Sequence, residues 1–285
     1  SNHAKTSLVN TVAQATNNQT SETFPYRIEK PVNVVWENTP RHEPEEIQGF
    51  NPKHDFNFLS VSQVSPRKNF ANMVKWFVEE FIDQEVGLVL KTNLASNCSM
   101  DYEKIKKHIE ILLSDYKDRK CSVYILHGDL TPGQMTGLYQ HEKIKGMINI
   151  AHGEGFGLPM FEAAREGLPI TTIGWSGQLD FLHHDGKDYY NSISYALQPI
   201  QQEAVWPGVL EKESLWANAD QGSYKMSLRK LYKNYDKFKE QAVELQDIVT
   251  DKFSDEKLYK LFCDNILGFD SSIIEEQEDV VMEFE

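Results

Sequence analysis

The fold is decided by the stretch Ala151-His-Gly-Glu-Gly-Phe-Gly-Leu-Pro-Met-Phe-Glu-Ala-Ala-Arg-Glu-Gly-Leu-Pro169. An apolar run over 146–151 predicts a strand that ends in this stretch. A helix is expected over 158–165, ending near Gly167, which suits a left-handed C-cap. Because ligands bind beyond the carboxyl ends of the strands in open α/β sheets, the glycine-rich loop is a candidate ligand site. The stretch therefore predicts both an α/β fold and the place of its site.

The rest of the chain alternates strand-like and helix-like segments in the same way. Short apolar runs predict buried strands, and apolar residues three and four positions apart predict amphipathic helices. The alternation predicts a parallel, Rossmann-like sheet with helices on both faces. The expected strands are 56–64, 86–92, 121–127, 146–151, 168–173 and 192–197, and the expected helices are 69–82, 101–117 with Asp101 as N-cap, 131–140 with Thr131 as N-cap, and 158–165.

Three regions divide the chain. Residues 1–50 predict a helix over 6–15 and a short strand over 31–36, and we interpret them as the remnant of a preceding domain with a crossover. Residues 51–267 are the Rossmann-like domain, ending in helices over 222–267. Residues 268–285 carry seven carboxylates and no Lys or Arg, which predicts a disordered acidic tail. The buried stripe of the C-terminal helices is expected to contain Met226, Leu228, Leu231, Tyr235 and Phe238.

Composition limits the classes of partner. The net charge of −14 opposes nucleic-acid binding, which depends on Lys and Arg neutralising phosphates. No apolar run is long enough for a transmembrane segment, and no secretory leader is evident. The three cysteines are widely spaced and predict reduced thiols. We expect a cytoplasmic protein, with a peripheral position at a membrane surface left open.

Two acids in the opening stretch have different positions. Glu154 lies in the loop and Glu162 about one turn inside the helix, so they are expected to contact two ends of one ligand. Carboxylates accept hydrogen bonds from vicinal hydroxyls, and the N–H groups near Leu158 and Met160 are expected to face an anion. Without further support, an acid early in a helix is the simpler reading of Glu162. A glycine-rich loop alone also fits dinucleotide enzymes.

The segment Gly153-Glu-Gly-Phe-Gly-Leu-Pro159, with the following Glu-Ala-Ala and Gly-Leu-Pro, resembles a known signature. It is similar to the glutamate–seven residues–glutamate motif of retaining glycosyltransferases of the GT-B architecture, family-4 or group 1 type. The resemblance implies that Glu154 is catalytic and contacts the donor sugar, whereas Glu162 binds the ribose hydroxyls. It places Gly155, Phe156, Gly157 and Leu158 in the donor site as well.

Three other segments agree with the same family in the same order. Residues 58–69 resemble its first strand and phosphate-binding loop, which implies that Lys68 contacts the donor diphosphate. Gln63 replaces an arginine of the family, and Arg67 is the candidate for the second cation. Residues 175–180 resemble a loop near the donor, where we place Ser176 and Gly177. Residues 127–131 resemble the segment that holds the nucleotide base, which implies contacts from Gly128, Leu130 and Thr131.

The resemblance also implies what the chain acts on. It predicts a UDP-, GDP- or ADP-linked sugar as donor, a glycan, lipid or protein acceptor, and a separate N-terminal GT-B domain carrying the acceptor site. No cofactor and no metal are expected, because the Asp-x-Asp motif of the other major glycosyltransferase architecture is missing. A non-catalytic nucleotide-binding or scaffold module and a sugar-nucleotide epimerase remain alternatives. An oxidoreductase is disfavoured because the glycines follow the fourth strand instead of the first.

Three histidines are candidates either for a structural role or for a role as ligands. His152, directly before the glycine-rich loop, fits a packing residue as well as a ligand. The pair His183-His184 precedes Asp185-Gly186 and favours a polar turn over a metal site.

Overall fold

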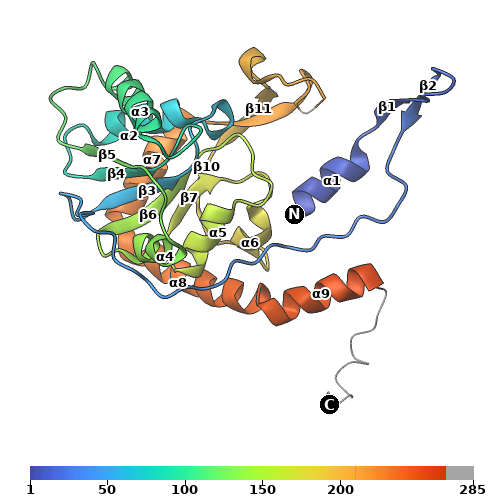
Figure 1. Ribbon diagram of the computed structural model, residues 1–285. Coiled ribbons are helices and arrows are strands. Elements are labelled where there is room, and N and C mark those ends of the chain that lie inside the picture. The colour runs from blue at the N-terminus through green and yellow to red at the C-terminus, as the bar shows by residue number, and fades with distance from the viewer. Residues whose placement is uncertain (209, 268–285) are drawn as a thin grey trace, which may run out of the picture.

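The structure is a computed structural model that describes residues 1–208 and 210–267 (Figure 1). Its centre is a six-stranded sheet in the order β10-β7-β6-β3-β4-β5, in which every neighbouring pair is parallel. The predicted parallel α/β fold is confirmed. The strands are β3 (Asn57–Val61), β4 (Gly87–Lys91), β5 (Ser122–Leu126), β6 (Ile144–Asn149), β7 (Ile170–Ile173) and β10 (Asn191–Ile193).

Helices cover both faces of this sheet, and each face has its own apolar core. Phe58 and Leu59 are adjacent in β3 and fully buried, but they belong to different cores because successive side chains of a strand point to opposite faces. One core holds α2 (Phe70–Phe81), α3 (Ser99–Leu112) and α7 (Gln221–Lys233). The other holds α4 (Pro132–Gln140), α5 (Leu158–Arg165), α8 (Tyr235–Lys252) and the start of α9 (Asp255–Leu267).

Smaller elements lie around the sheet. They are α1 (Asn2–Asn10), the antiparallel pair β1 (Ala13–Thr16) and β2 (Thr23–Tyr26), α6 (Leu179–Leu182), the turn pair β8 (His183–His184) and β9 (Lys187–Asp188), the hairpin of β11 (Tyr195–Pro199) and β12 (Leu215–Ala219), and two 3-10 turns at Pro66–Lys68 and Gln202–Ala204. The β1–β2 pair projects away from the sheet, and residues 27–50 run back beneath α5 and α4 (Figure 1).

Several local predictions were wrong. The N-terminal helix covers 2–10 rather than 6–15, and 31–36 form no strand; Trp36, at the end of this segment, donates to Asp180 of α6. The predicted strand 192–197 is divided: β10 ends at Ile193, and Tyr195 begins the β11–β12 hairpin. Met226 is 68% exposed on α7 and therefore is not part of the buried stripe, which contains Leu228, Leu231 and Phe238.

Of the two predicted N-caps, the one at Asp101 was wrong and the one at Thr131 is confirmed. α3 begins at Ser99 with Cys98 as its N-cap, so Asp101 lies in the first turn and binds the preceding loop instead of capping. Thr131 caps α4 as predicted, and it forms a capping box with Gln134. Gly167 has the predicted left-handed backbone, with φ of +64°.

The proposed division of the chain at residues 50 and 267 stays a prediction, and the acidic tail 268–285 lies outside the described residues. No helix of residues 1–208 and 210–267 combines the length and hydropathy that a membrane span requires.

Candidate functional site

The glycine-rich loop connects β6 to α5 at the carboxyl edge of the sheet. Gly157 is the N-cap of α5 and has φ of +92°, a left-handed conformation that side chains other than glycine adopt only with strain. No side chain of the described residues caps this helix, and Pro159 is in its first turn. The N–H of Met160 donates to the carbonyl of Gly157 at 2.9 Å, so the prediction that it faces an anion was wrong.

Glu154 lies in this loop as a buried carboxylate between two cations. Its Oε1 accepts from Lys68 Nζ at 2.5 Å and from Asn149 Nδ2 at 3.2 Å, and its Oε2 accepts from Arg67 at 3.1 Å. The Glu154 side chain is only 8% exposed. Burial by itself raises the pKa of Glu154, but Lys68, Arg67 and the Asn149 hydrogen bond outweigh it and hold the pKa below its ordinary value. Glu154 is therefore ionised at neutral pH.

The backbone of Glu154 is held by the loop after β7. Ser176 Oγ accepts from the Glu154 N–H at 3.0 Å and donates to its carbonyl at 2.6 Å, and the Gly177 N–H donates to the same carbonyl at 3.0 Å. A Cβ on Gly177 would overlap the carbonyl oxygen of Gly155, so only glycine fits there. Ser176 and Gly177, which were predicted to lie near the donor, therefore pack against the glycine-rich loop. Their contacts are with the backbone of Glu154 and Gly155.

Glu162 lines a cavity to which Glu154 does not contribute. It points from α5 toward Tyr139 of α4, whose hydroxyl donates to Glu162 Oε2 at 2.8 Å. Burial raises the pKa of Glu162, and the Tyr139 hydrogen bond and the nearby Arg165 offset only part of that rise. The Glu162 cavity, of about 310 Å³, is lined by Thr39, Pro40, His42, Leu130, Pro132, Met135, Thr136, Tyr139, Glu162, Arg165 and Glu166.

A second cavity lies where β3 and β4 end. This Lys68 cavity, of about 400 Å³, has two lysines among its lining residues, Lys68 and Lys91. Arg67 is not among its lining residues, because its guanidinium binds Glu154 and the carbonyl of Gly153. The lining residues are Val61, Ser62, Gln63, Lys68, Lys91, Thr92, Asn93, Asn97, Asp129, Leu130, Met135 and Pro159.

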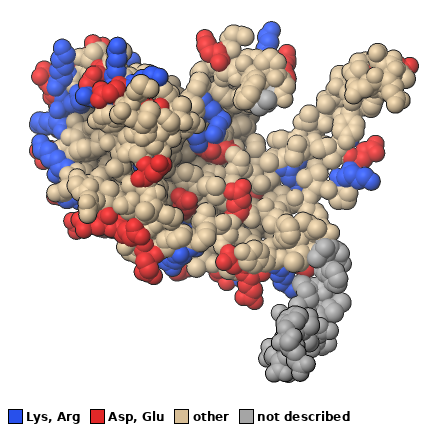
Figure 2. Space-filling model, viewed as in Figure 1, with Lys and Arg blue, Asp and Glu red and all other residues tan. Residues whose placement is uncertain are grey.

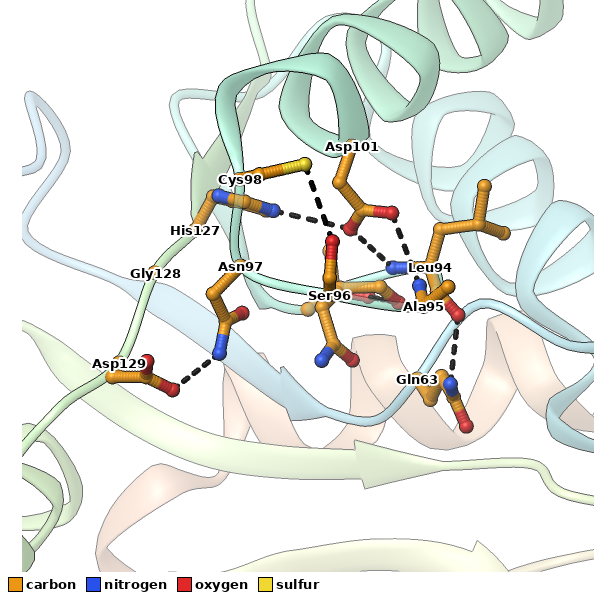
Figure 3. Close-up of polar contacts among 12 residues, drawn as sticks. Gln63, Leu94, Ala95, Ser96, Asn97, Cys98, Asp101, His127, Gly128 and Asp129 are labelled. Atoms are coloured by element: carbon orange, nitrogen blue, oxygen red, sulfur yellow. Dashed lines mark hydrogen bonds and ion pairs between the residues drawn. The ribbon is translucent and has the colours of Figure 1, made fainter.

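The loop after β4, residues 92–98, forms one wall of the Lys68 cavity and is fixed by a network of polar contacts (Figure 3). Asp101 accepts the N–H groups of Leu94 at 2.7 Å and Ala95 at 3.0 Å, and it pairs with His127 at 3.2 Å. Although burial raises the pKa of Asp101, these hydrogen bonds lower it to about 2. Gln63 donates to the carbonyl of Leu94 at 2.7 Å, so the residue that replaces the family's arginine tethers this loop.

A third cavity, of about 480 Å³, is bordered by the Glu154 end of the loop. The Glu154 cavity is lined by Ser1, Ala4, Val35, Trp36, Glu37, Glu154, Gly155, Phe156, Gly157, Leu158 and Pro159. Gly155 is open, since a Cβ there would meet nothing within 4 Å. The Phe156 ring is buried among Phe161, Phe181 and Phe253, so it anchors the loop to the core.

Of the residues predicted to hold the base, Leu130 lines a cavity, whereas Gly128 and Thr131 do not line the Glu162 or the Lys68 cavity. Leu130 lines both the Glu162 and Lys68 cavities, and the Gly128 carbonyl accepts from Lys91 Nζ at 2.7 Å. The Thr131 hydroxyl accepts the Gln134 N–H and donates to Glu45 at 2.7 Å, and its side chain lines neither cavity.

The histidines with alternative readings are packing and turn residues in this structure. His152 is 2% exposed, stacks on Trp216 with ring centroids 4.9 Å apart, and contacts the Ala217 carbonyl at 2.9 Å through Nδ1. His183 and His184 form β8 and enter the predicted turn, in which Asp185 and Gly186 have φ of 50° and 76°.

Sequence reasoning missed Lys91, Asn149, Tyr139 and the wall formed by residues 39–42. Lys91 and Asn149 end β4 and β6, and polar residues at carboxyl ends of parallel strands are a usable signal. Tyr139 and residues 39–42 carry no such signal, because their positions depend on tertiary packing.

Figure 2 shows Lys and Arg mixed with Asp and Glu on the viewed face, without a continuous basic stripe.

The chain is similar to known proteins in sequence and in fold. No family model matches the chain. It is 24% identical over 227 residues to poly(glycerol-phosphate) alpha-glucosyltransferase of Bacillus subtilis, covering 75% of this chain and 28% of that protein. It is 26% identical over 211 residues to sucrose-phosphate synthase 4 of Arabidopsis thaliana, covering 70% of this chain and 18% of that protein. An alpha,alpha-trehalose-phosphate synthase (UDP-forming) from Burkholderia vietnamiensis superposes with a TM-score of 0.53 at 10% identity, over 75% of this chain and 45% of that one.

The chain therefore spans about a quarter or less of the length of the two curated relatives. The chain is thus similar in sequence to enzymes named as a glucosyltransferase and a sucrose-phosphate synthase, which agrees with the resemblance of the glycine-rich segment to glycosyltransferases.

Proposed function

We propose that this chain is the donor-binding part of a glycosyltransferase that takes a sugar from a nucleotide sugar and transfers it with retention of configuration. The donor is a UDP-, GDP- or ADP-linked sugar. The acceptor is a glycan, lipid or protein hydroxyl, bound by a separate N-terminal domain of the same GT-B architecture. Activity of the whole protein is part of this proposal, since the chain covers so small a share of its relatives.

One observation carries the proposal: three adjoining cavities follow the carboxyl edge of the sheet in the order of the parts of a nucleotide sugar. The Glu162 and Lys68 cavities share Leu130 and Met135, and the Lys68 and Glu154 cavities share Pro159. The carboxylate of Glu162, the two lysines of the Lys68 cavity and the carboxylate of Glu154 therefore lie in series. A nucleoside, a diphosphate and a sugar present the complementary groups in that series.

The chemistry of each cavity supports the corresponding part. In the first, the Glu162 carboxylate accepts from the two ribose hydroxyls while Leu130 and Met135 offer apolar surface to the base. In the second, Lys68 offsets the charge of the diphosphate. In the third, Glu154 and the open backbone at Gly155 receive the hydroxyls of the sugar.

In the proposed reaction the bond from the anomeric carbon to the diphosphate oxygen breaks, and a bond to the acceptor oxygen forms on the same face. The nucleoside diphosphate leaves with the electron pair, and its departing oxygen accepts the proton that the acceptor hydroxyl loses. Charge develops on the departing oxygen as the bond lengthens, so a cation fixed beside it stabilises the transition state more than the ground state. The ionised Glu154, which contacts Lys68 at 2.5 Å, lies on the sugar side of the breaking bond, where positive charge develops.

Calorimetric titration with UDP, GDP and ADP tests the donor site. At least one nucleotide is expected to bind, and Glu162→Ala is expected to weaken it about tenfold or more because ribose hydrogen bonds to a charged group are lost. Glu103→Ala, on the exposed face of α3, is the matched control and is expected to change nothing. Absence of binding by all three nucleotides at millimolar concentration, or unchanged binding by Glu162→Ala, would refute the proposal.

A further inference from the structure

Arg67, the candidate for the second cation of the phosphate site, makes its contacts outside the Lys68 cavity. Arg67 follows the first strand of the sheet, but its guanidinium is held by the Glu154 carboxylate and by the Gly153 carbonyl at 2.6 Å. Gln63, at the position of the family's arginine, donates to the Leu94 carbonyl. The Lys68 cavity therefore has one cation from the expected segment and needs another to balance a diphosphate.

Lys91 is in position to supply that charge. It is the last residue of β4, paired in register with Val61 of β3 and Leu126 of β5, so its side chain starts at the carboxyl edge of the sheet. Lys91 lines the same cavity as Lys68. The cavity also borders Pro159 in the first turn of α5, where the helix dipole favours negative charge.

The positive charge of Lys91 is only partly compensated by neighbouring groups of the protein. Its Nζ donates to the Gly128 carbonyl at 2.7 Å, and within residues 1–208 and 210–267 it forms no ion pair with a carboxylate. Burial lowers the pKa of Lys91, and the charge of Asp129 opposes this only in part. Asp129 itself binds Asn97 across the cavity wall. Lys68, in contrast, is ion-paired to Glu154.

We propose that Lys91 is the second diphosphate-binding cation of this site, acting with Lys68 in place of the arginine that Gln63 replaces. The inference rests on the proposed function for the identity of the ligand. The ammonium keeps two N–H donors beyond the one given to Gly128, and they suit non-bridging phosphate oxygens. An anion in the cavity compensates the burial of Lys91, so binding is expected to raise the pKa of that lysine toward its ordinary value.

The test measures the affinity of the intact chain for two ligands, inorganic pyrophosphate and UDP, by titration calorimetry. Lys91→Met keeps the length of the aliphatic stem and removes the charge, and it is expected to weaken both ligands about tenfold or more. Lys91→Arg keeps a cation and is expected to retain most of the affinity. Lys106→Met, exposed on α3, is the matched control and is expected to bind both ligands as the parent chain does. Thermal unfolding of each variant checks that it is folded.

A second measurement uses the unsubstituted chain, so its result does not depend on how a substitution affects folding. In the unsubstituted chain with ¹³C-labelled lysine, pyrophosphate is expected to shift the Cε signals of Lys91 and Lys68 and to leave that of Lys106 unchanged. The inference is overturned if Lys91→Met binds both ligands with parent affinity, if the parent chain binds neither, or if the Lys91 signal does not move. UDP binding that is independent of Lys91 would leave the proposed function standing. Lys91-dependent pyrophosphate binding without binding of UDP, GDP or ADP would support the inference and overturn the proposed function.

Discussion

The carboxylate of Glu154 and the ammonium of Lys68 lie 2.5 Å apart, although 86 residues separate them in the chain. Lys68 ends the 3-10 turn after β3, and Glu154 follows β6, the strand that pairs with β3. The parallel pairing therefore brings the two loops together at one edge of the sheet. Because both side chains are almost fully buried, their charges compensate each other before any ligand arrives.

Removal of Lys68 is expected to destabilise the fold in a pH-dependent way. Lys68→Met leaves the buried Glu154 with only Asn149 and the more exposed Arg67 as partners, and we expect a loss of about 2–3 kcal/mol in the free energy of unfolding at pH 7. The pKa of Glu154 is lowered in the folded state, so its favourable contribution exists above the unfolded pKa and disappears as pH falls through the folded pKa. Urea unfolding at several pH values should show the cost of Lys68→Met shrinking in acid. A cost that is constant with pH would contradict this account, and Lys106→Met serves as control.

The pair Gly177 and Gly155 offers a test of loop geometry. Gly177→Ala places a Cβ onto the Gly155 carbonyl oxygen and is expected to cost about 2 kcal/mol or more while displacing the Glu154 loop. Gly155→Ala is the matched control, since its Cβ would enter open space. Chemical denaturation measures both costs. Equal stability of the two variants would mean that the two loops do not meet as described.

Asp101 predicts a second acid-dependent contribution, at the loop after β4. Its folded pKa of about 2 lies below the ordinary value of 3.8, so its ionised form stabilises the fold above about pH 4, and this contribution is lost as the pH falls toward 2. Asp101→Asn is therefore expected to be less stable than the parent chain at pH 6, with the difference narrowing steadily in acid. Unfolding free energies measured between pH 6 and pH 2 check this, and a difference that widens in acid would contradict the lowered pKa of Asp101.

Tyr139 controls the protonation of Glu162. The pKa of Glu162 is already raised by burial, and the Tyr139 hydrogen bond counteracts that rise. Tyr139→Phe is therefore expected to raise the pKa further, which ¹³C NMR of the labelled carboxyl group measures directly. A pKa that falls in this variant would show that the hydroxyl does not stabilise the carboxylate.

The sequence was sufficient where periodicity and strand–loop–helix order determine structure. The parallel sheet, α5 and the left-handed Gly167 follow from residues close together in the chain. The course of residues 27–50 could not be predicted, because it depends on contacts with helices that come later. The N–H of Glu45, for example, donates to the Gly133 carbonyl at 2.9 Å, and this anchors the segment beside the Glu162 cavity.

The same distinction holds for the candidate site. Glu154, Glu162 and Lys68 were identified through the resemblance of their motifs, and the structure places each of them in the wall of a cavity or beside one. Lys91 belongs to no recognised motif, and its place at the carboxyl end of β4 was the one signal that could have identified it. The role of Arg67 stays a prediction, and the sequence could not show that its guanidinium contacts Glu154.

A crystal structure of the chain soaked with UDP and, separately, GDP tests the central claim most directly. The account predicts nucleotide density along the carboxyl edge of the sheet, with the ribose hydroxyls on Glu162 and the terminal phosphate at Lys68, pointing toward Glu154. A nucleotide bound elsewhere, or bound in the reverse direction with its phosphates at Glu162, would contradict it.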